Sequence, residues 1–385
     1  MRIAFLSTFF VGEYGVTRVL AAQMPLLVAA GHGVDLYACF LDKALVPHGV
    51  HAVRVPTHFR GLRECLQRGA YDVVIACTEQ FFSLVADWKL DAVTVAYEHG
   101  YIPVELTIPE EREQHRKMIE ERVNRIYPAF DYVMTISRYA VDYIRWPAAF
   151  VLYNGADHFA EALCSSPVAA RAEGAASEGA PIRVLAVCRY RTVEWEGKGM
   201  DDFCRLKRDL GDRVDITVIG GGDEATCQKL ADAGVRGLGV VRDPAEMAKA
   251  YAGCDVLVSF SRCEMFNLPL AEAGFARKPA LALDVCAHPE VTPFVFGNYE
   301  GIRDYLAAAT AQSLAADGEK MFEFVDARFR WKMNAQRLLE FLEGICPAGK
   351  AAGGSRKKTP SFLFRLRWTF WRLREFVRNT VRRRG

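Results

Sequence analysis

Two glutamates, Glu264 and Glu272, lie on either side of a Phe-Asn-Leu-Pro segment that directly follows the apolar run CDVLVSF. On one continuous helix, eight residues would turn the second carboxylate about 80° away from the first, since each residue rotates by roughly 100°. The asparagine and the proline argue against such a helix. They favour a buried strand that ends at Phe260, a short loop, and a new helix that begins near Leu268.

A helix that begins at this point would present free backbone amides at Asn267 and Leu268, which form a site for an anion. Arg189 and Lys198, in the segment RYRTVEWEGKG, would add a planar guanidinium and a compact point charge. Such groups stabilise the negative charge that builds on an anionic leaving group. One preorganised donor of this type is worth on the order of 3 kcal/mol.

Two series of apolar runs alternate with helix-compatible segments, and they predict the elements that position these side chains. The first series is RIAFLST, GVDLYACF, YDVVIAC, AVTVAYEHG, YVMTISR and VLYNGAD, and the second is IRVLAVCR, DITVIGGG, VRGLGVV, CDVLVSF and KPALALD. This alternation predicts parallel sheets wrapped by helices. Ligands bind beyond the carboxyl ends of the strands in such sheets, and Glu264 follows one of those ends.

Four motifs occur in a fixed order over roughly residues 1–345. They are Gly12-Glu13-Tyr14-Gly15-Val16-Thr17-Arg18, Tyr153-Asn154-Gly155-Ala156-Asp157, Arg189 with Lys198-Gly199, and Glu264 with Glu272. Together they resemble the motifs of the retaining nucleotide-sugar glycosyltransferases of family four, which have the GT-B fold. The chain departs from that pattern at Tyr14, where the family has a glycine, and at Cys286-Ala287-His288, where it usually has a Gly-rich turn.

The resemblance implies a role for four charged residues of these motifs. Arg189 and Lys198 would clamp the diphosphate, and Arg191 is an alternative to Arg189 because the spacing to the lysine is longer than in the family. Glu264 would face the transferred sugar. Glu272 would accept hydrogen bonds from the ribose hydroxyls, about one turn into the helix.

Two further residues, Gly15 and His99, take their expected roles from the same resemblance. Gly15 would let the backbone of the first domain approach the phosphates. His99, in AYEHGYIP, matches a family histidine near the donor and acceptor sugars, with a packed or capping histidine as the alternative. The role of His288 stays open, because its loop differs from that of the family.

The resemblance and the apolar pattern together predict an α/β chain with two Rossmann-like doubly wound domains that face a cleft. We expect an acceptor-side domain over residues 1–158, a linker with an insertion over 159–181, and a nucleotide-sugar-binding domain over 182–325. A helix over 326–347 should pack back toward the first domain. Residues 348–385 should form a flexible linker and a basic amphipathic helix.

That C-terminal segment carries an unusual charge. The formal net charge of the chain is +2, but residues 356–385 hold 11 Lys/Arg and one acid, so the rest of the chain carries −8. Leu363, Leu366, Phe370, Leu373 and Val377 would share one helical face. With its arginines and tryptophans, the segment 360–384 is typical of a helix on an anionic membrane surface. Docking onto a protein surface and RNA binding are the alternatives.

Composition limits the remaining possibilities. The 11 cysteines include no Cys-x-x-Cys pair, which argues against a disulfide framework or a cysteine zinc site and favours a reducing cytosol. We find no uninterrupted stretch of about twenty apolar residues, which is the length that a helix needs to span a bilayer. The chain contains no Asp-x-Asp motif, so we expect neither a metal nor another cofactor.

We therefore predict a metal-independent hexosyl- or related transferase on the cytoplasmic face of a membrane. It would transfer a sugar from a nucleotide diphosphate-sugar to an acceptor hydroxyl, on a lipid-linked glycan or a glycolipid, with retention at the anomeric carbon. A nucleotide-sugar epimerase of the same fold and a non-catalytic nucleotide-sugar-binding or scaffold protein are the alternatives.

Overall fold

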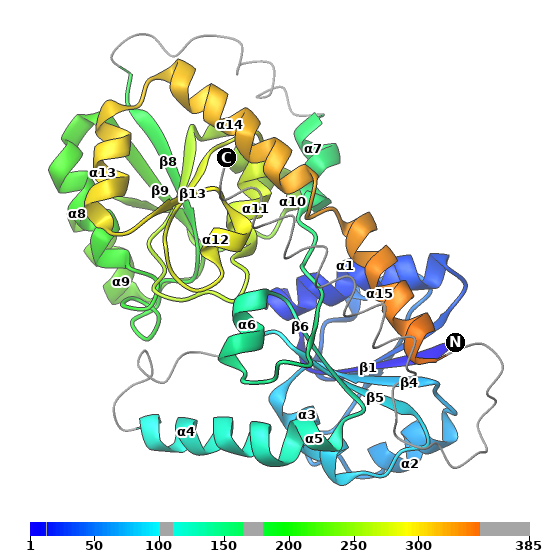
Figure 1. The fold of residues 1–385 in the computed structure, drawn as a ribbon. Coiled ribbons are helices and arrows are strands. Elements are labelled where there is room, and N and C mark those ends of the chain that lie inside the picture. The colour runs from blue at the N-terminus through cyan, green and yellow to red at the C-terminus, as the bar shows by residue number, and fades with distance from the viewer. Residues whose placement is uncertain (13, 101–110, 165–179, 347–385) are drawn as a thin grey trace.

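The protein folds into two α/β domains, each built on a parallel sheet with helices on both faces (Figure 1). The computed structural model describes residues 1–12, 14–100, 111–164 and 180–346. The predicted amphipathic helix at 360–384 and Glu13 of the first motif therefore lie outside the described residues. Among the described residues, no helix has both the length and the apolar character needed to cross a membrane.

The N-terminal sheet has seven strands in the order β3-β2-β1-β4-β5-β6-β7. The strands are β1 Arg2–Phe10, β2 Gly33–Leu41, β3 His51–Arg54, β4 Val73–Ala76, β5 Val93–Glu98, β6 Tyr132–Thr135 and β7 Phe150–Val151. Successive side chains of a strand point to opposite faces. Ile3 and Phe5 thus enter one core cluster while Ala4 and Leu6 enter another, which explains why the strands are apolar throughout.

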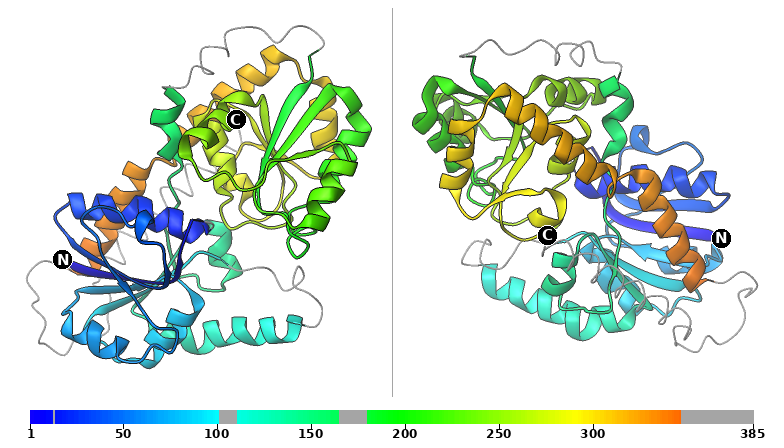
Figure 2. Two further views of the ribbon diagram at one scale, coloured as in Figure 1. Left: turned by 180° about the vertical axis from the view of Figure 1, so that it is seen from behind. Right: turned by 45° about the horizontal axis from the view of Figure 1, so that its top comes forward.

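Helices cover both faces of this sheet. They are α1 Gly15–Ala29, α2 Leu62–Arg68, α3 Glu79–Asp87, α4 Arg112–Glu121, α5 Tyr127–Ala129 and α6 Arg138–Tyr143. In Figure 1, α1 lies on the opposite face of the sheet from α2, α3 and α5. The C-terminal α15 (Trp331–Ile345) packs beside α1, and Figure 2 shows this helix leaving the second domain to lie against the first.

The C-terminal sheet has six strands in the order β10-β9-β8-β11-β12-β13. The strands are β8 Ile182–Val187, β9 Val214–Ile219, β10 Arg236–Gly237, β11 Val256–Ser259, β12 Ala280–Leu283 and β13 Phe294–Phe296. Its helices are α8 Met200–Leu210, α9 Glu224–Asp232, α10 Pro244–Gly253, α11 Leu268–Phe275, α12 His288–Val291, α13 Tyr299–Ala308 and α14 Ala311–Asp326. The strand-helix order reverses beside β8, which is where such sheets bind ligands.

The chain crosses between the domains twice, and the two crossings touch. The Asp157 carboxylate accepts a hydrogen bond of 2.7 Å from the Trp331 amide at the start of α15. A Cβ on Gly155 would lie 2.4 Å from the Trp331 ring, so the close approach of the crossings requires this glycine. The Asn-Gly-Ala-Asp motif therefore joins the end of the first domain to the returning helix.

The structure differs from the sequence prediction at three elements. Strands β3 and β13 were not expected, and each forms an edge of its sheet. The predicted linker over 159–181 begins with packed residues: Ala160–Cys164 form helix α7, and Phe159 and Leu163 are buried in the core. Residues 165–179 of that segment lie outside the described part of the chain.

Candidate active site

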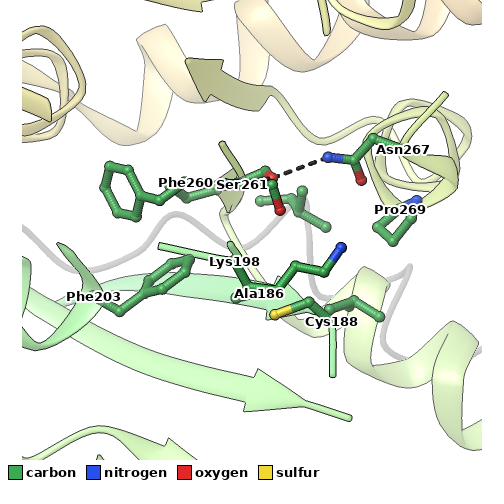
Figure 3. A pocket seen from close by; sticks show the side chains of 12 residues that line it. Ala186, Cys188, Lys198, Phe203, Phe260, Ser261, Asn267 and Pro269 are labelled. Atoms are coloured by element: carbon green, nitrogen blue, oxygen red, sulfur yellow. Dashed lines mark hydrogen bonds between the residues drawn. The ribbon is translucent and has the colours of Figure 1, made fainter. Parts of the chain in front are cut away.

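Strand β11, its loop and helix α11 have the strand-turn-helix arrangement predicted around the two glutamates. Helix α11 begins at Leu268 with Pro269 in its first turn. Asn267 precedes it in the left-handed conformation, with φ of 51°. Asparagine is one of the few residues besides glycine that tolerate this conformation. Asn267, Pro269 and Lys198 line one small pocket (Figure 3).

The side chain of His288 holds Asn267 in place. Its Nδ1 lies 2.8 Å from the Leu283 carbonyl oxygen, which only accepts, so Nδ1 carries the proton. Its Nε2 then accepts from the Asn267 amide at 2.9 Å, and that amide also donates to Ser259 Oγ at 3.0 Å. Burial lowers the pKa of His288, which favours this neutral tautomer.

Lys198 and Glu264 form an ion pair at the same end of the sheet. Lys198 Nζ lies 2.5 Å from Glu264 Oε1, and both side chains are about three-quarters buried. Burial alone would raise the pKa of Glu264 and lower that of Lys198. Their mutual attraction outweighs burial in each case, so the pKa of the carboxyl is lowered and that of the amine is raised. The pair therefore stays charged at neutral pH.

The two candidate arginines share one acid. Arg189 Nε lies 3.2 Å from Glu194 Oε1, and Arg191 Nε lies 3.9 Å from Glu194 Oε2. The charge of Arg189 opposes the raised pKa of Lys198, so the two cations lie near each other. The structure therefore brings Arg189, Lys198 and Glu264 together, and both guanidinium groups remain partly exposed.

Glu272 lies where the two domains meet, and three side chains bind the two oxygens of its carboxylate. Oε1 lies 3.1 Å from Arg18 Nη1 and 3.1 Å from His158 Nε2, while the Tyr251 hydroxyl donates to Oε2. The carboxylate is 1% exposed. Although burial would raise the pKa of Glu272, these partners lower it to about 2. A nucleotide ribose would have to compete with them.

The remaining two predicted residues lie on the N-terminal domain. His99 follows β5, and burial lowers its pKa to about 3. No described residue hydrogen-bonds its enclosed Nε2. A Cβ on the next residue, Gly100, would lie 2.1 Å from Met265, so this segment reaches the loop that carries Glu264. A Cβ on Gly15 would meet nothing within 4 Å, so protein packing does not demand this glycine.

Sequence reasoning missed three residues that join the domains here. Arg18 and His158 bind Glu272. Glu290 of α12 accepts from the amides of Arg138 and Tyr139 at the start of α6, at 2.9 and 2.7 Å, and from the Tyr153 hydroxyl. Arg18 stands in the first motif, but no local pattern indicates its partner across 254 residues.

Comparison with known proteins assigns each domain to a family model. Residues 14–158 match the model "Glycosyltransferase Family 4", and residues 181–319 match "Glycosyl transferases group 1". No curated protein sequence matches the chain.

Solved structures share the fold at low sequence identity. Anabaena HepE in complex with UDP and glucose is 17% identical, with a TM-score of 0.70 over 89% of this chain and 99% of that chain. A glycosyltransferase from Rickettsia africae is 15% identical, with a TM-score of 0.67 over 90% and 99%. WaaG, described as a glycosyltransferase involved in lipopolysaccharide biosynthesis, is 16% identical, with a TM-score of 0.62 over 90% and 100%. The chain belongs to the glycosyltransferases of family-four type with the GT-B fold.

Proposed function

We propose that this glycosyltransferase transfers a sugar from a nucleoside diphosphate-sugar to an acceptor hydroxyl with retention at the anomeric carbon. The observation that carries this proposal is the charged Lys198–Glu264 pair beside the N-terminus of α11. A cation and a helix N-terminus favour a diphosphate. The neighbouring carboxylate can accept hydrogen bonds from a sugar.

In this proposal Lys198 and Arg189 bind the diphosphate together with the backbone at Asn267 and Leu268. Their charge compensates the leaving group as its bond to the sugar breaks, so the reaction needs no metal. Arg191 shares Glu194 with Arg189 and remains the alternative clamp. The exposed guanidinium groups leave room for a phosphate to replace the glutamate as a partner.

Donor binding involves Glu272 and the opposite domain. The ribose hydroxyls would take over part of the hydrogen bonding that Arg18, His158 and Tyr251 now supply to this carboxylate. The space beside Gly15 would admit the phosphates. His99, whose Nε2 is enclosed and neutral, would hydrogen-bond a hydroxyl of the donor or acceptor sugar.

We further propose that the acceptor is a lipid-linked glycan or a glycolipid and that the enzyme works on the cytoplasmic face of a membrane. The basic, aromatic composition of residues 360–384 supports attachment to an anionic surface. Among the similar structures, WaaG and the galactosyltransferase WaaB are described as lipopolysaccharide enzymes, which supports an acceptor of this class.

The test is a thermal-shift panel of nucleoside diphosphates and their sugars, followed by product analysis with the best donor. A bound donor raises the melting temperature because it stabilises only the folded chain. We expect transfer to an added glycolipid in the presence of a chelator, with an unchanged anomeric configuration by NMR. Interconversion of donor sugars without acceptor would indicate an epimerase, and binding without turnover would indicate a scaffold protein.

A further inference from the structure

Two cysteines meet beside Glu264 on loops that come from different strands. Cys263 follows β11, and Cys286 follows β12. Two contacts bracket the pair: Cys286 Sγ lies 3.8 Å from the Arg262 carbonyl oxygen, and the Ala287 amide donates to the Glu264 carbonyl at 3.1 Å. Because residues 262 and 264 both contact this turn, the backbone at Cys263 runs beside the backbone at Cys286. Each thiol shifts the pKa of the other, raising that of Cys263 and lowering that of Cys286, so their sulfur atoms lie near each other.

The surroundings suit a reactive thiol pair. Both cysteines are half-buried, and the Cys286 sulfur contacts the carbonyl of Arg262 at the protein surface. Hydrogen bonding from Cys263 and from the Tyr139 hydroxyl lowers the pKa of Cys286 to about 6, against the opposing effect of burial. The lowered pKa favours the thiolate of Cys286, which is the reactive form of a cysteine.

We propose that Cys263 and Cys286 are an oxidisable pair, a modification site next to Glu264 at which hydrogen peroxide closes a disulfide. The Cys286 thiolate attacks a peroxide oxygen, the O–O bond breaks, and the leaving hydroxide is protonated to water. The resulting sulfenic acid is attacked by the Cys263 sulfur, which forms the S–S bond and releases a second water. Overall, two thiols are oxidised and one peroxide is reduced.

The loops that carry this pair also position the proposed site. Residue 264 immediately follows Cys263, and His288, which holds Asn267, stands two residues after Cys286. Cys286 has φ of 52°, so its turn is already held in a conformation that few side chains adopt. A disulfide requires a restricted separation of the two backbones. Closing it would shift Glu264 and Asn267 and suppress transfer, an effect that rests on the proposed function.

The experiment uses the full chain, treated with hydrogen peroxide, alkylated and mapped by mass spectrometry. We expect a Cys263–Cys286 cross-linked peptide with the loss of two hydrogens, reversed by dithiothreitol. In Cys263→Ser, Cys286 should accumulate as a sulfenic acid that dimedone traps. In Cys286→Ser, Cys263 should remain reduced. Cys65→Ser, which alters an exposed cysteine of α2, should still form the cross-link.

Peptide mapping of the wild type decides the proposal without any enzyme assay. Two thiols that stay alkylatable in peroxide, or a cross-link from either to another cysteine, would overturn it. In a parallel activity assay, the wild type should lose glycosyl-transfer activity after peroxide treatment and regain it with dithiothreitol. The Cys286→Ser variant should keep its activity after the same treatment. Cross-linking without any change in activity would contradict the link to Glu264 and leave the proposed function intact.

Discussion

Lys198 is the residue on which the proposed chemistry depends most directly. Replacing it in Lys198→Ala removes the cation that compensates the leaving diphosphate and leaves Glu264 without its partner. We expect kcat/KM to fall by a factor on the order of 10² or more. Steady-state kinetics with the best donor measures this. Lys249→Ala, which alters an exposed lysine of α10 paired with Glu246, should keep wild-type kinetics.

Glu272 links the stability of the protein to pH. Its pKa is lowered from 4.5 to about 2 in the folded protein, so its stabilising effect is complete above pH 4.5 and is lost as the pH falls toward 2. We expect Glu272→Gln to cost about 3 kcal/mol of unfolding free energy at pH 7. Calorimetry of both proteins from pH 7 to pH 3 should show their melting temperatures converging at low pH. A constant difference would contradict the assignment.

Which site residues the sequence could predict depends on how local their surroundings are. Glu264, Lys198 and Asn267 are positioned by a single strand-loop-helix junction and its neighbouring strand, so a short motif suffices to find them. Arg18 and His158 were missed because their partner, Glu272, reaches them only when the two domains dock. Docking depends on the whole surface of each domain, which no short pattern encodes.

At the level of elements, the start of α8 depends on a single glycine. Gly199 has φ of 62°, and a Cβ there would lie 2.3 Å from the Phe260 carbonyl oxygen. We expect Gly199→Ala to destabilise the protein by about 1 to 3 kcal/mol because backbone strain and a clash coincide.

Denaturant titration measures this effect, and Gly253→Ala is its matched control. Gly253 lies at the end of α10, where a Cβ would meet nothing within 4 Å and φ is not positive. That substitution should be neutral or slightly stabilising. If both variants were equally stable, the tight approach of Gly199 to β11 would not matter for stability.

The elements predicted from sequence are those buried on both faces. Strands such as β4 (VVIA) read as continuous apolar runs because helices cover them on either side. Strand β3 (HAVR) has no buried residue and pairs on one edge only, so its composition resembles that of a loop. The three-residue β13 is likewise half-buried and follows α12 closely. Short edge strands bury too few side chains to produce a recognisable apolar pattern in the sequence.

At the scale of the whole molecule, Glu290 of the C-terminal domain binds the start of helix α6 in the N-terminal domain. Its carboxylate caps α6 through two backbone amides and binds the Tyr153 hydroxyl at 2.6 Å. We expect Glu290→Ala to accelerate amide exchange in α6 by roughly tenfold or more, because bonds to a charged group are lost. Hydrogen-exchange mass spectrometry measures this. Glu319→Ala, which breaks an exposed pair with Arg277, should leave α6 unchanged.

The charge distribution of the whole chain leads to the last prediction. Residues 356–385 carry a net charge of +10 and residues 1–355 a net charge of −8. An anionic surface should therefore attract residues 356–385 and repel the rest of the chain. Each basic residue near anionic lipid contributes about 1 kcal/mol to the free energy of membrane binding, and this contribution decreases as the salt concentration rises. Deleting residues 356–385 should abolish co-sedimentation with phosphatidylserine vesicles while the thermal shift with donor persists. If the truncated chain co-sedimented as well as the full chain, residues 1–355 would bind the membrane and residues 356–385 would bind a different partner.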